Sequence, residues 1–134
     1  MEIANFVRDS QENYQICFLP FFNAAHHDIK MFRRVLKKVN LTDISYFVAP
    51  EYQSIEVMIL MIKSCDLFVN MRYHASLLAM QHNKLNISIC YDIHPHYFNK
   101  INYIHQKFNN DNIISYGNYR TGDLYSMLKK LVSV

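Results

Sequence analysis

Residues 67–91 have the sequence LFVNMRYHASLLAMQHNKLNISICY, and they carry the clearest indication of the fold class. Its two ends, Leu67–Val69 and Ile87–Tyr91, are short and mostly apolar, which is typical of strands that are buried on both faces. The segment between them predicts a helix that begins near Tyr73 and ends near Asn83. A helix between two buried strands predicts that both strands are parallel members of one sheet.

The same alternation extends over the rest of the chain. Three further short apolar runs are expected to be buried strands: Ile16–Phe22, Ile44–Val48 and Ile113–Tyr116. Apolar residues at helical spacing predict helices at about 29–39, 52–62, 96–108 and 124–131, with a leading helix within residues 1–13. The predicted fold class is therefore α/β, a Rossmann-like three-layer sandwich of about five parallel strands with helices on both faces.

Length and composition narrow the class of protein. The 134 residues are 51% hydrophobic, which predicts a single domain over residues 1–134. A net charge of +3 is too small a basic excess for a protein that binds nucleic acid. The longest apolar run, Val57–Ile62, is too short to span a membrane.

Glycine and cysteine usage exclude further classes. The two glycines, Gly117 and Gly122, are too few for a G-x-G-x-x-G dinucleotide motif, and Asp123 stands where a phosphate loop needs lysine. The three cysteines, Cys17, Cys65 and Cys90, lie in or beside apolar runs. Their odd number and setting predict reduced, buried thiols and a cytoplasmic protein.

Polar side chains gather in the segments that follow the predicted strands. Ligands of open parallel sheets bind outside the carboxyl ends of the strands, where these segments meet. In chain order they contribute Asn23, His26, His27 and Asp28; Glu51; Arg72 and His74; Asp92, His94 and His96; and Asn118, Arg120 and Thr121. Histidines and arginines beside helix N-termini suit an anionic ligand such as a phosphate or a carboxylate.

Other chemistries find less support in the sequence. The pairs His26–His27 and His94-x-His96 could bring imidazoles together, but no nearby pair of cysteines completes a metal site, so neither metal nor cofactor is expected. Ser76 lacks the G-x-S-x-G setting of a nucleophile. The basic residues of the segment 29–39 are expected to form a solvated helix face, and His82 and His105 are expected to have ordinary surface or packing roles.

Ser64–Ala79 resembles the C-terminal half of the polysaccharide pyruvyl transferase family. In that family an Asp opens a buried strand, an Arg-x-His follows the strand, and an Ala-containing helix begins; here these are Asp66, Arg72, His74 and Ala75. The segment 86–92 is similar to the family's next strand with its aromatic exit, and the run 16–21 with Asp28 beyond it is also similar. The resemblance covers residues 15 to about 108.

Two positions depart from the family pattern. The family usually has Gly and Pro between the helix and the next strand, whereas this chain has Asn83–Asn86. The family usually has a Lys shortly after the aromatic residue, and His94 stands at about that place.

The resemblance implies a fold and an activity. It implies the donor-binding C-terminal lobe of a two-lobed, glycosyltransferase-B-like enzyme that moves pyruvate from phosphoenolpyruvate to sugar hydroxyls of a cell-surface polysaccharide. The implied partners are phosphoenolpyruvate, a glycan acceptor, and either a separate N-terminal lobe or a second copy of the chain. The resemblance implies that His74 is the general acid or contacts the phosphate, and that Arg72 binds the donor anion. Further donor-binding candidates are Asp92, His94, Arg120 and His26.

Two other functions remain open from the sequence. A nucleotide-sugar-binding lobe of a GT-B glycosyltransferase would share the architecture and use the same edge of the sheet for a diphosphate. A non-catalytic flavodoxin-like module would bind a partner or a small anion without turning it over.

Overall fold

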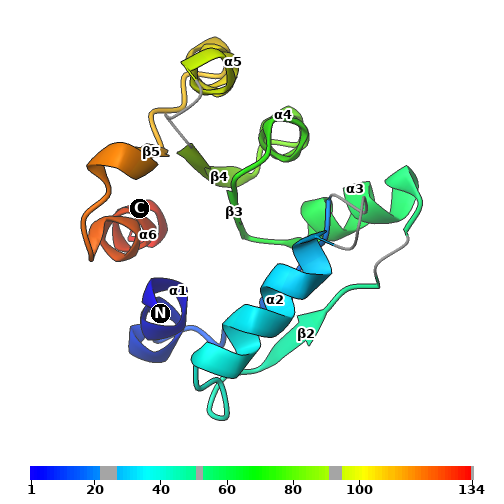
Figure 1. The fold of residues 1–134 in the computed structure, drawn as a ribbon, viewed down its shortest axis with the longest axis vertical. Coiled ribbons are helices and arrows are strands. Elements are labelled where there is room, and N and C mark those ends of the chain that lie inside the picture. Colours follow the sequence, from blue (N-terminus) through cyan, green and yellow to red (C-terminus); the bar gives the residue numbers. More distant parts are fainter. Residues whose placement is uncertain (22–26, 51–52, 91–94, 134) are drawn as a thin grey trace. The chain divides into compact units, whose positions relative to one another are not determined.

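A computed structural model describes residues 1–21, 27–50, 53–90 and 95–133 (Figure 1). The chain forms two compact units, Met1–Ser54 and Ile55–Val134. Across the described residues, helices alternate with five strands, and every strand pairing is parallel. The predicted α/β class with about five parallel strands is therefore confirmed, while a single domain over residues 1–134 stays a prediction.

The first unit contains α1 (Glu2–Asp9), β1 (Ile16–Phe18), α2 (His27–Lys38) and β2 (Tyr46–Val48). The two strands pair in parallel, with Ile16 opposite Tyr46 and Phe18 opposite Val48. The core of this unit contains the buried residues Ala4, Leu41 and Ile44, against which Val7, Ile16, Phe18, Leu36 and Val39 pack. The sequence therefore placed its leading helix correctly, and this helix contributes to the core.

An ion pair ties α1 to the loop before β2. The guanidinium of Arg8 donates from Nε to Asp43 Oδ2 at 2.6 Å and from Nη2 to Asp43 Oδ1 at 2.8 Å. Nη2 also donates to the carbonyl of Asn40 at 2.6 Å. The hydrogen bond from Arg8 lowers the pKa of Asp43 to about 2, so the carboxylate is charged at neutral pH.

The second unit is built on a three-stranded sheet. Its elements are α3 (Ile55–Ser64), β3 (Leu67–Asn70), α4 (Tyr73–Gln81), β4 (Leu85–Cys90), α5 (Pro95–Lys107), β5 (Ile113–Ser115), the 3-10 helix η2 (Tyr116–Asn118) and α6 (Asp123–Val132). The strand order is β3-β4-β5, with Val69 opposite Ile87 and Ile89 opposite Ile114. Residues 67–90 thus form the β3-α4-β4 unit of this half of the chain.

Helices cover both faces of this sheet. Within the second unit α4 and α5 lie together on one face, and α6 lies on the other (Figure 1). The apolar core between them contains Ile62, Ala75, Ala79, Met80, Ile87, Cys90, Ile101, Ile104, Ile114, Leu124 and Leu128. Small residues on α4 let this helix approach the sheet closely, which brings its N-terminus next to the end of β3.

Asparagines end two of the helices that precede strands. Asn83 after α4 and Asn109 after α5 have φ values of 54° and 49°, in the left-handed region where glycine is the usual residue. Asparagine tolerates this conformation better than other non-glycine residues. The chain therefore reverses direction after α4 and α5 without glycine.

The strand boundaries differ from the sequence prediction in the first unit. β1 ends at Phe18 instead of Phe22, because Pro20 has no N–H to donate to a ladder. β2 begins at Tyr46 instead of Ile44, whose N–H donates to the Leu41 carbonyl in a turn. All three residues of β2 are exposed, so the expectation that this strand is buried was wrong.

The central strand offers a direct test of the core. Ile87 is 0% exposed on β4, whereas Leu85 on the same strand is 43% exposed. We expect Ile87→Ala to lower the free energy of unfolding by about 2–5 kcal/mol, because it leaves a cavity in a packed site. Leu85→Ala is the matched control and should cost less than about 1 kcal/mol. Urea unfolding followed by circular dichroism measures both, and equal losses would contradict the assignment of the core.

Candidate anion-binding site

The carboxyl ends of β3, β4 and β5 lie at one edge of the second unit's sheet, because the strands are parallel. Arg72 and His74 follow β3, and Arg120 follows β5 after η2. Since β4 lies between these two strands, their ends are about 10 Å apart. The other candidates, Asp92, His94 and His26, lie outside the described residues.

The turn between β3 and α4 is held by side chains on both sides. Arg72 is the N-cap of α4 with an extended backbone, and its N–H donates to Asn70 Oδ1 at 3.1 Å. The hydroxyl of Tyr97, from the first turn of α5, accepts the Tyr73 N–H at 3.0 Å and donates to the Met71 carbonyl at 3.0 Å. Asn70 at the end of β3 and Tyr97 on α5 therefore both hold the backbone around Arg72 in place.

The N-terminus of α4 keeps donors available. Within the described residues, the N–H groups of His74 and Ala75 in the first turn have no hydrogen-bond partner, and the first turn contains no acidic residue. The side chain of Arg72 is half-buried and that of His74 is exposed, with its ring edge-on to Tyr73 at 5.2 Å between centroids. Free amides, the helix dipole, a guanidinium and an imidazole together favour an anion.

Arg120 stands at a helix N-terminus that already has a negative charge. Its backbone N–H donates to Asp123 Oδ2 at 2.7 Å, and Asp123 lies in the first turn of α6. Gly122 caps this helix with φ 101°, a left-handed conformation that glycine adopts without strain. The Asp123 carboxylate therefore puts a negative charge at the N-terminus of α6, which disfavours an anion there, and α4 is the better anion site.

A buried polar network lies beneath the β3–α4 turn. The buried members are Asn70 at the end of β3, Ser76 on α4, Asn86 and Ser88 on β4, and His105 on α5. Asn70 Nδ2 donates to Asn86 Oδ1 at 2.7 Å, and Ser76 Oγ donates to Asn70 Oδ1 at 2.7 Å. The oxygens of Ser76 and Ser88 are 2.6 Å apart. Three elements are therefore joined through one set of side chains.

His105 closes the network on the side of α5. Its Nε2 is 2.7 Å from Ser88 Oγ, and its Nδ1 lies 3.1 Å from the Asn110 carbonyl and 3.0 Å from Asn110 Oδ1. The Asn112 N–H donates to this same Oδ1, which fixes the orientation of the Asn110 amide. Nδ1 therefore faces two acceptors and carries a proton. Burial lowers the pKa of His105, against the opposing effects of Asn110 and Asp111.

Sequence reasoning missed this network, although β4 carried a signal of it. Asn86 and Ser88 alternate with Ile87 and Ile89, and residues two apart on a strand share a face. When a strand that lies between two apolar strands has a polar face, the polar side chains of that face are expected to have hydrogen-bond partners in the interior. Those partners lie on α4 and α5, so the sequence pattern of β4 alone cannot identify them.

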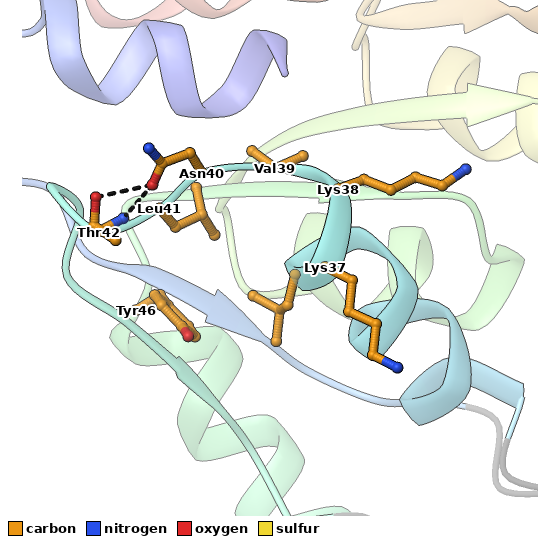
Figure 2. A pocket seen from close by; sticks show the side chains of 8 residues that line it. Lys37, Lys38, Val39, Asn40, Leu41, Thr42 and Tyr46 are labelled. Carbon is orange, nitrogen blue, oxygen red and sulfur yellow. Dashed lines mark hydrogen bonds between the residues drawn. The ribbon is translucent and has the colours of Figure 1, made fainter.

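An open hollow of about 410 Å³ lies at the end of α2 in the first unit (Figure 2). It is lined by Leu36, Lys37, Lys38, Val39, Asn40, Leu41, Thr42 and Tyr46. In Figure 2 the two lysine side chains extend away from Tyr46, and the Thr42 N–H and hydroxyl both donate to Asn40 Oδ1. The polar side chains of Asn40 and Thr42 are therefore hydrogen-bonded to each other at the rim of the hollow.

Other candidate chemistries find no support in the described part of the chain. Over residues 1–21, 27–50, 53–90 and 95–133, no three histidine, cysteine, aspartate or glutamate side chains gather as metal ligands would. All three cysteines are free thiols; Cys90 is buried and Cys65 is half-buried, but Cys17 is exposed, contrary to expectation. The helices in these residues are all too short or too polar to cross a membrane.

Comparisons of the chain with protein-family models, with curated proteins and with solved structures found no match. The assignment of a function therefore depends on the residues and the geometry of the site.

The role of Tyr97 in holding the turn is testable by hydrogen exchange. We expect Tyr97→Phe to speed exchange of the Tyr73 amide by about ten-fold or more, because that N–H loses its acceptor. Tyr103 lies on the same helix with 65% exposure, so Tyr103→Phe is the matched control and should leave this amide unchanged. Unchanged exchange in Tyr97→Phe would show that the turn is held without the hydroxyl.

Burial of His105 predicts how stability depends on pH. The folded chain has a His105 pKa below the ordinary value of 6.5, so its neutral form stabilises the fold above pH 6.5. As the pH falls below 6.5, this contribution is lost with a slope of at most about 1.4 kcal/mol per pH unit. Urea unfolding between pH 5 and 8 should show the loss, and His105→Gln should reduce it. A slope identical in both proteins would contradict the prediction.

Proposed function

We propose that the second unit is the donor-binding part of a polysaccharide pyruvyl transferase, which holds phosphoenolpyruvate at the N-terminus of α4. The proposal rests on the resemblance of Ser64–Ala79 to that family and on the setting of Arg72 and His74 in the structure. The glycan acceptor would then be bound with the help of a further lobe or a second copy of the chain, in the cytoplasm.

One observation carries the proposal. Arg72 and His74 both follow β3 at a helix N-terminus whose first-turn amides at His74 and Ala75 have no partner in the described residues. Phosphoenolpyruvate bears a phosphate and a carboxylate on adjacent groups, so it needs several donors within a small space. A planar guanidinium can donate two parallel hydrogen bonds to either group, and helix amides donate to the other.

The residues also suit the chemistry of transfer. Formation of a ketal from phosphoenolpyruvate requires a proton on the methylene carbon, attack on the enol carbon by two hydroxyls of the sugar, each of which loses its proton, and departure of phosphate from the same carbon. His74 is exposed and stands beside the amides of the helix, so as an imidazolium it can supply that proton or bind the phosphate. Arg72 holds the anion in place and balances the charge of the leaving phosphate.

The turn after α4 agrees with the resemblance. The family usually has a glycine there, and in this chain Asn83 takes the left-handed conformation with φ 54°. Asparagine therefore meets the backbone requirement that a glycine would otherwise meet.

Calorimetry with the intact chain tests the proposal. We expect phosphoenolpyruvate to bind, and Arg72→Gln and His74→Gln each to weaken binding by about ten-fold or more, as loss of a hydrogen bond from a charged group does. His82→Gln, at the other end of α4, and Arg33→Gln, on the exposed face of α2, are the matched controls and should bind like the unaltered chain.

Three results would count against the proposal. Binding of uridine diphosphate in place of phosphoenolpyruvate would indicate the nucleotide-sugar lobe of a glycosyltransferase. Binding of neither ligand would indicate a module that does not hold a donor. Equal loss in the control variants would place the anion elsewhere.

A further inference from the structure

The hydroxyl of Ser76 takes part in two short oxygen–oxygen contacts but has a single proton. It lies 2.7 Å from Asn70 Oδ1 and 2.6 Å from Ser88 Oγ. Asn70 Oδ1 is an amide oxygen that also accepts the Arg72 N–H, so it can only accept. If Ser76 donates to Asn70, the contact with Ser88 needs a proton from Ser88.

Whether Ser88 can supply that proton depends on His105. Ser88 Oγ accepts from Asn86 Nδ2 at 3.2 Å and lies 2.7 Å from His105 Nε2. In the neutral imidazole the proton is on Nδ1, so Nε2 accepts and takes the Ser88 proton. In the imidazolium Nε2 donates to Ser88, and the Ser88 proton becomes available to Ser76. Both short contacts of Ser76 are thus satisfied together only when His105 has two protons.

We propose that His105 is a positioning residue for the candidate anion-binding site. When Nε2 takes up a proton from solvent, the Ser88 hydroxyl stops donating to Nε2 and donates to Ser76 Oγ instead. The Ser76 hydroxyl then donates to Asn70 Oδ1, which also accepts the Arg72 N–H. In the neutral state the Ser76 proton is divided between two acceptors, and Asn70 is held less firmly. The buried chain of hydrogen bonds therefore transmits the charge state of α5 to the turn between β3 and α4.

The surroundings of His105 leave few competing charges. The groups that it and its network contact on β3, α4 and β4 are Asn70, Ser76, Asn86 and Ser88, none of which is ionisable. From the loop before β5, Asn110 accepts from Nδ1 and the exposed Asp111 raises the pKa of His105.

The consequence for ligand binding rests on the proposed function, whereas the coupling of His105 to Arg72 does not. A firmer turn at Arg72 should tighten anion binding as the pH falls. His74 carries a second imidazole, which is exposed and two residues from Arg72. A His74→Gln background removes this second imidazole.

Nuclear magnetic resonance of the full chain in the His74→Gln background tests the coupling. We expect the amide shift of Arg72 to change with pH at the same midpoint as the His105 ring nitrogens, which burial places below the ordinary pKa of 6.5. The Ser126 amide in α6 is the internal control and should not follow this midpoint. Adding Ser76→Ala should leave His105 titrating and remove the response of Arg72, because the chain of hydroxyls is cut.

Three outcomes would overturn the positioning role. These are an Arg72 amide shift that stays constant while His105 titrates, an Arg72 response that persists in Ser76→Ala, and a His105 ring with one protonation state from pH 5 to 8.

Binding of sulfate, whose charge is constant in this range, separates the coupling from the proposed function. Coupling together with tighter sulfate binding at low pH supports both, whereas coupling without sulfate binding supports the positioning role and rejects the anion site.

Discussion

The hydrogen bonds of the Asn70 side chain are the constraint on which the site depends. Asn70 is the last residue of β3, and its side-chain amide makes three hydrogen bonds. Oδ1 accepts from the Arg72 N–H and from the Ser76 hydroxyl on α4, and Nδ2 donates to Asn86 Oδ1 on β4. Each of these bonds is buried or half-buried, so water competes little for its donors and acceptors. The end of the strand, the start of the helix and the neighbouring strand are consequently fixed relative to one another.

Polar groups in a core are costly unless each one has its partners. Ser76, Ser88 and His105 are almost entirely buried, and each has hydrogen-bond partners in the interior. An apolar core of the same shape could be equally stable, so stability alone does not explain the network. A network of this kind specifies one arrangement of α4 and α5 on the sheet, because other arrangements would leave buried polar atoms without partners.

The order of elements in the fold could be predicted from local patterns. Short apolar runs and helical spacing predicted, in the right order along the chain, the five strands and six α-helices found in the described residues, since both periodicities follow from backbone geometry. Boundaries were less accurate where a single residue decides them, as at Pro20 in the first unit. The exposure of β2 could not be foreseen, because burial depends on which elements cover a strand.

Local patterns were enough to predict that parallel strands end beside polar residues and that Arg72 and His74 leave one strand together. Tertiary contacts were needed to see that, within the described residues, the N–H groups of His74 and Ala75 on α4 have no hydrogen-bond partner, and that Asp123 puts a negative charge at the N-terminus of α6. They were also needed to see that His105 is a buried partner of Ser88. The physical reason is that periodicity acts over a few residues, whereas a hydrogen bond between α5 and β4 joins groups that only packing brings together.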